Sequence, residues 1–307
     1  GNKLAKVNIQ VNRLQYNQSE NEVKLTTENY YWQVVMLKEK LQTITVVEAQ
    51  LTNLLKDVEA SVNAGVTTRN DLLQVQLRQS SRSQIENALT LSQQMLAQYI
   101  GEDSGIVDVP PVAGEVLPEH PQGLYRNPES SLVLTNEYHL LQQNLKANKL
   151  QRRITVGKYL PTVAIGGGGY MYDNLMDKDH PFWMGFATVS IPLSGWWGGS
   201  HDVRKQELQV RNAENQFTDQ SELLILRMQQ NWNDLKDAYK QMQISMRSIE
   251  QATENLRLNT DYYKAGTCTM NDLLDAQTLF QQSKDRYVES YARYEVKKCE
   301  YLQATGR

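Results

Sequence analysis

The amino-acid sequence predicts a mainly α-helical protein, built of long antiparallel coiled-coil helical hairpins in two structural repeats, with one β-hairpin. Three observations lead to this prediction. The pattern A-G-x-x-T-x-N-D-L-L occurs twice, beginning at Ala64 and at Ala265. A long stretch before the first copy has helical periodicity and contains no proline or glycine. Two short runs that look extended occur together near the middle of the chain.

The two copies of the pattern belong to a longer internal duplication. They begin 201 residues apart, and the same offset holds without a gap back through Tyr31 against Trp232 and Gln15 against Gln216. A gap-free match of this length indicates two copies of one helical hairpin. The segment between the copies is therefore where we expect the architecture to change.

The first hairpin is predicted to start with a helix over residues 4–62. Apolar residues recur along it every three or four positions, which is typical of a helix that packs along one stripe. At 1.5 Å per residue it would be about 90 Å long, so its partners must be equally long helices lying alongside. Gly65 ends it, and Thr68 with Asp71 predicts a capping box for a second helix that reaches about Ile100.

The segment between the copies predicts a connector, one helix and a β-hairpin. Glycines and prolines interrupt residues 101–128, which indicates a loop, and a helix is expected from about Pro128 to Lys158. Two runs then follow, 163–172 and 182–191, and each has the roughly 9 to 11 residues of a tilted membrane strand. The alternative is a soluble hairpin that covers one end of a helical bundle. The membrane-strand candidates are Val163, Ile165, Tyr170, Tyr172, Phe182, Trp183, Phe186 and Val189.

The second repeat is expected to mirror the first. Pro192, Gly195, Gly198 and Gly199 should precede a helix from about residue 202 to 263, and Thr269 with Asp272 should cap a last helix that reaches about Ala304. These boundaries divide the chain into five segments. They are a first-repeat long helical hairpin (1–101), an irregular connector (102–128), the leading helix of the second repeat (129–160), the β-hairpin (161–193) and the second-repeat long helical hairpin (194–307).

Composition excludes several classes of protein. With 40% apolar residues the chain is not disordered, and no stretch has the roughly 20 apolar residues of a membrane-spanning helix. The net charge of -3 gives no basic footprint for nucleic acid. Cys268 and Cys299 would lie about 46 Å apart on one helix, too far for a disulfide. The four histidines lack the spacing of metal ligands, so we expect no metal and no cofactor.

The order of these features resembles the TolC-like outer-membrane efflux protein family. The most specific shared parts are the two A-G turns, the Y-L-P-T segment that ends at Thr162 and the S-I-P-L segment that begins at Ser190. The resemblance covers essentially the whole chain. It implies a homotrimer whose subunits contribute strands to one shared transmembrane β-barrel and helices to a periplasmic tunnel. It also implies that the chain is truncated at the N-terminus, lacking the first helix and first β-hairpin of the family.

The resemblance assigns roles to the two turns. Matched position by position, Asp272 and Asp275 fall on the acidic positions of a periplasmic gate, while Asp71 and Tyr263 fall on positions that tie neighbouring helices shut. Cys268 departs from the family pattern, because the best-known member of the family has an arginine at this position, and that arginine helps to hold the closed state. The tip at which a periplasmic adaptor docks would consist of Gly65, Val66, Thr67, Thr68, Gly266, Thr267 and Thr269.

Electrostatics gives the acidic residues a role that does not depend on the resemblance. In a symmetric trimer one inward Asp becomes a ring of like charges, which lowers the energy of cations in a narrow aqueous passage. The alternative is that Asp71 and Asp272 only cap their helices, and the two roles are compatible. Asp275, one turn further on, is the cleaner candidate. We expect the leucine pairs 72–73 and 273–274 to form hairpin core rather than a docking surface.

These inferences lead to one function and one alternative. We expect an outer-membrane channel of a Gram-negative bacterium, the exit duct of a tripartite efflux pump or type I secretion system. It would be a passive conduit across the periplasm, gated at its periplasmic tip, with a periplasmic adaptor, an inner-membrane transporter and outer-membrane lipid as partners. The alternative is a soluble coiled-coil scaffold or adaptor protein. An enzyme comes third, because the sequence has no phosphate loop, nucleophile elbow or Cys/His constellation.

Overall fold

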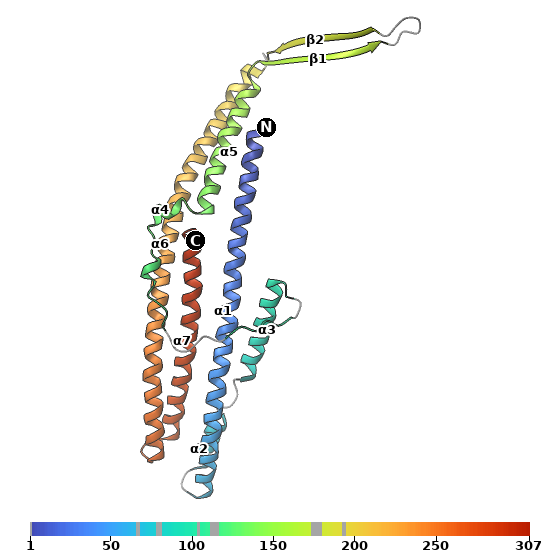
Figure 1. Ribbon diagram of the computed structural model, residues 1–307. Coiled ribbons are helices and arrows are strands. Elements are labelled where there is room, and N and C mark those ends of the chain that lie inside the picture. The colour runs from blue at the N-terminus through green and yellow to red at the C-terminus, as the bar shows by residue number, and fades with distance from the viewer. Residues whose placement is uncertain are drawn as a thin grey trace. The chain divides into compact units, whose positions relative to one another are not determined.

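A computed structural model describes residues 2–65, 68–77, 82–102, 105–110, 117–172, 180–191 and 195–307 (Figure 1). These residues form long α-helices and one antiparallel pair of strands, which confirms the predicted fold class. In chain order the elements are α1 (Asn2–Asn63), α2 (Arg69–Leu77), α3 (Arg82–Ile100), the 3-10 helix η1 (Pro121–Leu124), α4 (Pro128–Leu132), α5 (Asn136–Lys158), β1 (Thr162–Tyr172), β2 (His180–Ser190), α6 (Gly195–Lys264) and α7 (Met270–Ala304).

The chain divides into two compact units. The first consists of residues 1–16 and 136–223, and it contains α5, β1 and β2 with the adjoining parts of α1 and α6. The second consists of residues 17–135 and 224–307, and it contains both glycine turns. None of the helices in the described ranges is at once long enough and apolar enough to cross a membrane.

The β-hairpin belongs to the first unit. β1 and β2 pair in antiparallel register, from Thr162 opposite Ser190 to Tyr172 opposite His180. A Cβ on Gly166 would lie 2.5 Å from the ring of Phe186, because that ring lies across the glycine. The glycine run of β1 therefore makes room for aromatic side chains of β2. Both predicted strands are present, and residues 173–179 between them lie outside the described residues.

The start of α6 differs from the prediction. The helix begins at Gly195 rather than near residue 202, so the expectation that Gly195, Gly198 and Gly199 precede it was wrong. The ring of Tyr159 explains the glycine at position 199, because a Cβ there would lie 2.8 Å from it. The Tyr159 hydroxyl also donates a hydrogen bond to Asp202 at 2.6 Å. Gly199 is thus explained by close packing of α6 against the end of α5. Helix propensity, which disfavours glycine, does not take such tertiary contacts into account and therefore predicted a later start.

The second unit is organised by three groups of buried side chains. The first joins α6 to α7, the second joins α1 and α2 to α7, and the third holds α3 and residues 105–110 against α1. The apolar stripe predicted for the first helix is confirmed, since Ile44, Val47, Leu51 and Val58 are all buried. The centres of the three groups are Leu235, Met242, Tyr294 and Tyr301 in the first, Val58, Val75 and Leu274 in the second, and Val34, Leu96 and Val109 in the third.

The helix predicted to run unbroken from about Pro128 to Lys158 is two helices, α4 and α5. At the break, Thr135 is buried and its hydroxyl donates to the carbonyl of Leu132 at 2.8 Å. Gly306 packs against Leu134 so closely that a Cβ there would lie 2.8 Å from the Leu134 carbonyl oxygen. This contact joins residues far apart in sequence, so periodicity could not predict the break.

Candidate functional site

The two glycine turns lie at the same end of the second unit (Figure 1). Val58, before the first turn, and Val75, after it, share one buried group with Met270 and Leu274, which follow the second turn. Tyr263, just before the second turn, packs half-buried against the same group. The predicted gate residues of α2, α6 and α7 are therefore gathered in one region.

Both turns depend on glycine at their centre. The φ angle is +76° at Gly65 and +72° at Gly266, in the left-handed region that side chains with a Cβ rarely adopt. In the second turn the amide of Gly266 donates to the carbonyl of Tyr263, and the amide of Thr267 donates to the carbonyl of Tyr262, at 3.0 and 2.9 Å. This pair of bonds is the Schellman motif, which satisfies the last carbonyls of α6.

A capping box starts α7. The amide and hydroxyl of Thr269 donate to the Asp272 carboxylate at 2.9 and 2.6 Å, and the Asp272 amide donates back to the Thr269 hydroxyl at 3.2 Å. The hydrogen bond from the Thr269 side chain, followed by that from its backbone, lowers the pKa of Asp272. The predicted capping role of Asp272 is confirmed. Its carboxylate stays exposed to solvent, so it can also present charge.

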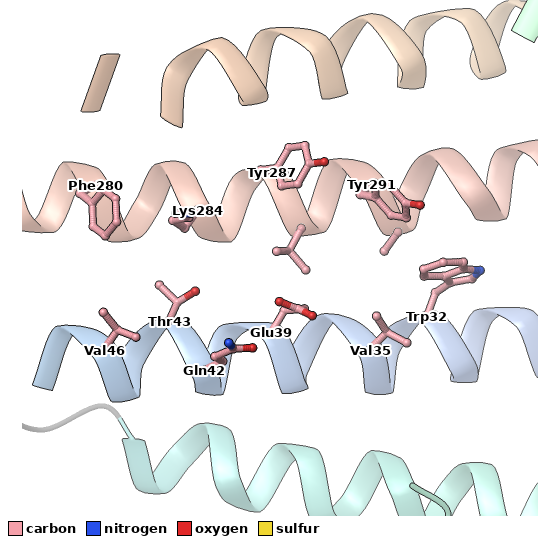
Figure 2. A pocket seen from close by; sticks show the side chains of 12 residues that line it. Trp32, Val35, Glu39, Gln42, Thr43, Val46, Phe280, Lys284, Tyr287 and Tyr291 are labelled. Carbon is pink, nitrogen blue, oxygen red and sulfur yellow. The ribbon is translucent and has the colours of Figure 1, made fainter. Parts of the chain in front are cut away.

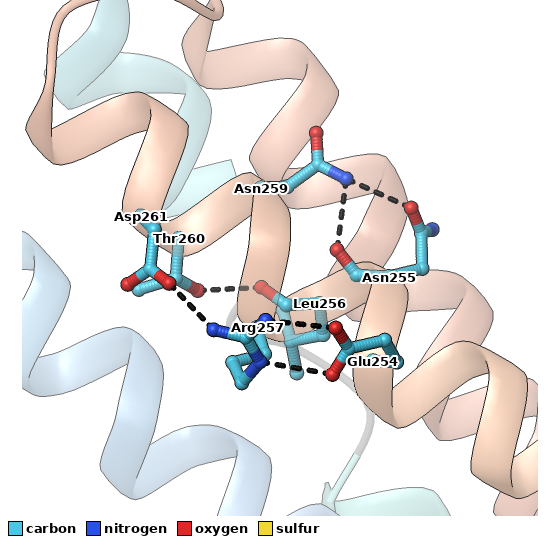
Figure 3. A network of polar contacts seen from close by, with 7 residues as sticks. All are labelled: Glu254, Asn255, Leu256, Arg257, Asn259, Thr260 and Asp261. Atoms are coloured by element: carbon cyan, nitrogen blue, oxygen red, sulfur yellow. Dashed lines mark hydrogen bonds and ion pairs between the residues drawn. The ribbon is translucent and has the colours of Figure 1, made fainter.

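The last turns of α6 carry a set of ion pairs, here called the clamp, that was not predicted from the sequence (Figure 3). The Arg257 guanidinium donates to Glu254 at 2.9 and 2.7 Å and to Asp261 at 2.9 Å. The hydrogen bond and charge of Glu254 raise the pKa of Arg257. The signal was present in the sequence, because acids stand three residues before and four residues after the arginine, where helical neighbours meet. The clamp ties the end of α6 just before Gly266.

Cys268 lies within the second turn. Its thiol is half-buried and donates to the carbonyl of Asn259 at 3.4 Å. Burial, followed by the charge of Asp272, raises the pKa of this thiol. Cys268 and Cys299 are both free thiols, as the sequence predicted.

The remaining predicted turn residues differ in exposure. Asp275 is exposed and Asp71 is half-buried. Val66 and Thr67 lie outside the described residues, while the other residues assigned to the docking tip are exposed. The leucine pairs also differ, because Leu273 and Leu274 are buried as predicted, whereas Leu73 is 49% exposed.

The β-hairpin presents one strongly apolar face. Val163 lies opposite Val189 and Ile165 opposite Ala187, so these side chains share a face. Ile165 is 86% exposed, and Trp183 on the same face is 79% exposed. Phe186, on the other face, is exposed as well. The side chains of Tyr170, Tyr172 and Phe182 lie outside the described residues.

A hollow of about 300 Å³ lies between α1 and α7 in the second unit (Figure 2). Trp32 and Tyr291 stand at one end of it, and Val46 and Phe280 at the other. Burial lowers the pKa of Lys284, which also lines the hollow. No pattern in the sequence pointed to these residues. In the described ranges, no group of three His, Cys, Asp or Glu side chains could hold a metal ion.

Comparison with solved structures identifies the class of fold. The outer-membrane channel OprN superposes with a TM-score of 0.85 at 14% identity, covering 99% of this chain and 70% of that one. VceC from Vibrio cholerae gives 0.81 at 14% identity, covering 99% and 74%. The MtrE channel of Neisseria gonorrhoeae, in its open state, gives 0.81 at 12% identity, covering 99% and 71%. The fold is therefore that of outer-membrane channels.

Sequence comparison then identifies the family. The profile of the outer membrane efflux protein family matches residues 131–300, which is more than half of the chain. The chain belongs to this family. Comparison with curated proteins gave no match. Membership assigns the chain to the outer membrane of a Gram-negative bacterium, with helices that extend into the periplasm, and it favours an efflux duct over the soluble scaffold.

Proposed function

We propose that the protein is the outer-membrane exit duct of a tripartite efflux pump or type I secretion system, and that its gate lies where the two glycine turns meet. The observation that carries this proposal is the shared buried group of the turns, in which Val58 and Val75 pack with Met270 and Leu274. Two hairpins that end together can form the rim of a tube when three copies assemble.

The proposed gate is electrostatic. Asp272 and Asp275 are one turn of helix apart, and both are exposed at the start of α7. In a homotrimer each becomes a ring of negative charge, which favours cations in a narrow aqueous passage and repels anions. Asp71 and Tyr263 flank this position on α2 and α6, where they tie the neighbouring helices together. Cys268 supplies no positive charge that could help to hold these helices in a closed state.

The proposed partners follow from the two exposed regions. A periplasmic adaptor, which links the duct to an inner-membrane transporter, docks on the exposed turn residues Gly65, Thr68, Gly266, Thr267 and Thr269. The β-hairpin contributes β1 and β2 to the outer-membrane barrel. Its face with Ile165 and Trp183 supports a lipid contact, since large apolar side chains are exposed there to the extent of 86% and 79%. In this proposal the two long helical hairpins (1–101 and 194–307) and the helix of residues 129–160 form the tunnel. The connector (102–128) joins the repeats, and the β-hairpin (161–193) enters the membrane.

Ion selectivity in planar bilayers tests the proposal. The full-length channel is expected to prefer cations, and Asp275→Asn is expected to weaken that preference without altering the cap, which uses Asp272. Asp237→Asn is the matched control, because Asp237 is an exposed residue of α6 away from the turns. Equal selectivity of the Asp275→Asn and Asp237→Asn channels would remove the gate assignment. A protein that forms no pore at all would contradict the duct itself.

A further inference from the structure

The contact between α1 and α7, here called the seam, changes along its length within the second unit. Near the glycine turns it is apolar and closely packed, since Val47, Leu51 and Leu274 are all buried. Further from the turns, the same two helices enclose the hollow of about 300 Å³ (Figure 2). A hollow removes apolar contacts from the helices that line it, so charged groups contribute more to holding the seam there.

Three charged side chains lie in this looser stretch of the seam. Lys40 of α1 forms an ion pair with Glu289 of α7, with 2.5 Å between the Nζ and Oε1 atoms. Asp285 lies one turn before Glu289 on α7, where the charges of both Lys40 and Glu289 act on it. Two carboxylates of α7 therefore face one ammonium group of α1, and that ammonium group is paired with Glu289.

Asp285 is partly removed from water without gaining a partner. Its Oδ1 atom is buried and has no hydrogen-bond partner among the residues that the structure describes. Burial raises the pKa of Asp285, while the charge of Lys40 opposes this rise and the charge of Glu289 adds to it. An ionised carboxylate in such a place is costly, because desolvation is not offset by a hydrogen bond or a close ion pair.

The other charged groups of this stretch do not offset the charge of Asp285. Glu39 and Lys284 line the hollow, which Asp285 does not, and the charge of Glu39 acts on Lys284. Arg286, the next residue on α7, is exposed to solvent. Among the described residues, the charges that act on Asp285 are thus those of Lys40, from the facing helix, and of Glu289.

The other copy of the hairpin lacks these three charges. At the offset of 201, the corresponding positions carry uncharged residues. They are Gln241 for Lys40, Gln84 for Asp285 and Ala88 for Glu289. A coiled-coil hairpin of this kind therefore does not require the charges, and a role at the seam between α1 and α7 accounts for them better.

We propose that the Asp285 carboxylate is a proton switch of this seam. When it is ionised, its charge repels Glu289 and competes for Lys40, which loosens the seam. A proton taken from bulk water neutralises it and leaves the pair of Lys40 and Glu289 without a competitor. One consequence rests on the proposed function. Because α1 leads to the first glycine turn and α7 follows the second, a tighter seam holds the mouth of the duct shut, so the duct conducts less at acidic pH.

Asp285→Asn imitates the protonated state and tests the switch in the full-length channel. Because the pKa of Asp285 is raised in the folded state, the destabilisation is complete above the folded pKa and is relieved as the pH falls towards the unfolded value of about 3.9. The variant should therefore raise the melting temperature by about 2 to 4 °C at about pH 7 and not at about pH 4. Asp237→Asn, at an exposed aspartate of α6 in the same unit, is the matched control and should leave it unchanged.

Glu289→Gln gives a sharper test, because it frees Lys40 to pair with Asp285. In this background Asp285→Asn removes a close ion pair, so it should lower the melting temperature at about pH 7 instead of raising it. The same sign in both backgrounds overturns the proposal. So does an Asp285→Asn channel that melts like the Asp237→Asn channel at every pH.

Conductance in planar bilayers separates the switch from the duct. Wild-type and Asp237→Asn channels should conduct less at about pH 5 than at about pH 7, whereas Asp285→Asn should remove this difference. An equal pH dependence in the two variants contradicts the proposed switch. A protein that forms no pore contradicts the proposed duct instead, and the melting temperatures then decide whether Asp285 controls the seam.

Discussion

The two glycine turns have the same motif but different surroundings. Gly65 and Gly266 take nearly the same φ, +76° and +72°. The Thr269 amide lies 2.9 Å from its capping carboxylate, whereas the Thr68 amide lies 3.4 Å from Asp71. The motif therefore sets the turn, and the contacts around it decide how firmly the turn is held.

The clamp on α6 is the clearest difference between the copies. Arg257 and its two acids correspond, at the offset of 201, to Lys56, Asn53 and Ala60. The first copy has no pair of acids with which to build the same clamp. The second turn is thus tied on both sides, by the clamp before Gly266 and by the capping box after it. We infer that the second turn is the stiffer half of the proposed gate.

The leucine pair offers the largest expected difference. Leu274 is 3% exposed and Leu73, its counterpart, is 49% exposed. Leu274→Ala should lower the free energy of unfolding by about 2 to 5 kcal/mol, because it leaves a cavity. Leu73→Ala should change it by about 0.5 kcal/mol or less. Denaturant unfolding of the helical region, followed by circular dichroism, measures both, and equal losses would show that the two copies are packed alike.

Replacing the turn glycines should affect both copies equally. Gly65→Ala and Gly266→Ala each place a Cβ in the left-handed region, which costs about 1 to 2 kcal/mol. Neither added Cβ meets another atom within 4 Å, so the cost should come from the backbone alone. The same unfolding measurement applies. A large loss at one position and none at the other would contradict the equivalence of the turns.

The capping box of α7 should respond to acid. The pKa of Asp272 is lowered in the folded state, so the folded protein binds fewer protons at this carboxylate than the unfolded chain does. The contribution of Asp272 to stability is therefore complete above its unfolded pKa and is lost as the pH falls through the folded pKa. Asp272→Asn should make the melting temperature less sensitive to pH between about 5 and 2. An unchanged pH profile would exclude the capping carboxylate as the cause.

The smallest expected effect concerns the clamp. Arg257→Gln removes exposed ion pairs, which contribute little to global stability. It should instead speed amide hydrogen exchange over residues 254–261, and high salt should have the same effect on the wild type. The sharper test builds the clamp into the first copy with Asn53→Glu, Lys56→Arg and Ala60→Asp. Exchange before Gly65 should then slow, and no change there would show that the clamp does not stiffen a turn.

Local chemistry made much of this fold predictable. Gly65 and Gly266 end helices because of their own φ, and Thr269 with Asp272 forms a cap within four residues, so one sequence window contains the whole cause. The strands were likewise predictable from two runs of residues. The early start of α6 was not predictable, because Gly199 makes room for Tyr159, and the break before α5 lies against Gly306, which is distant in the sequence.

The site was predictable only in part, for the same reason. Asp272 and Asp275 could be named because the motif occurs twice. The exposure of Leu73 could not be inferred from Leu274, since identical motifs pack against different partners. The Arg257 clamp, by contrast, was readable from its spacing along a single helix.

The distance between the two turns tests the central claim most directly. Spin labels at Thr68→Cys and Thr267→Cys, with Cys268 and Cys299 replaced by serine, would be measured by double electron–electron resonance in protein diluted with unlabelled chains. Neighbouring hairpins that end together predict a separation within about 20 Å, given helix spacings of about 8 to 10 Å. Turns at opposite ends of residues 17–63 would lie about 70 Å apart, and such a distance would contradict a shared mouth of the duct.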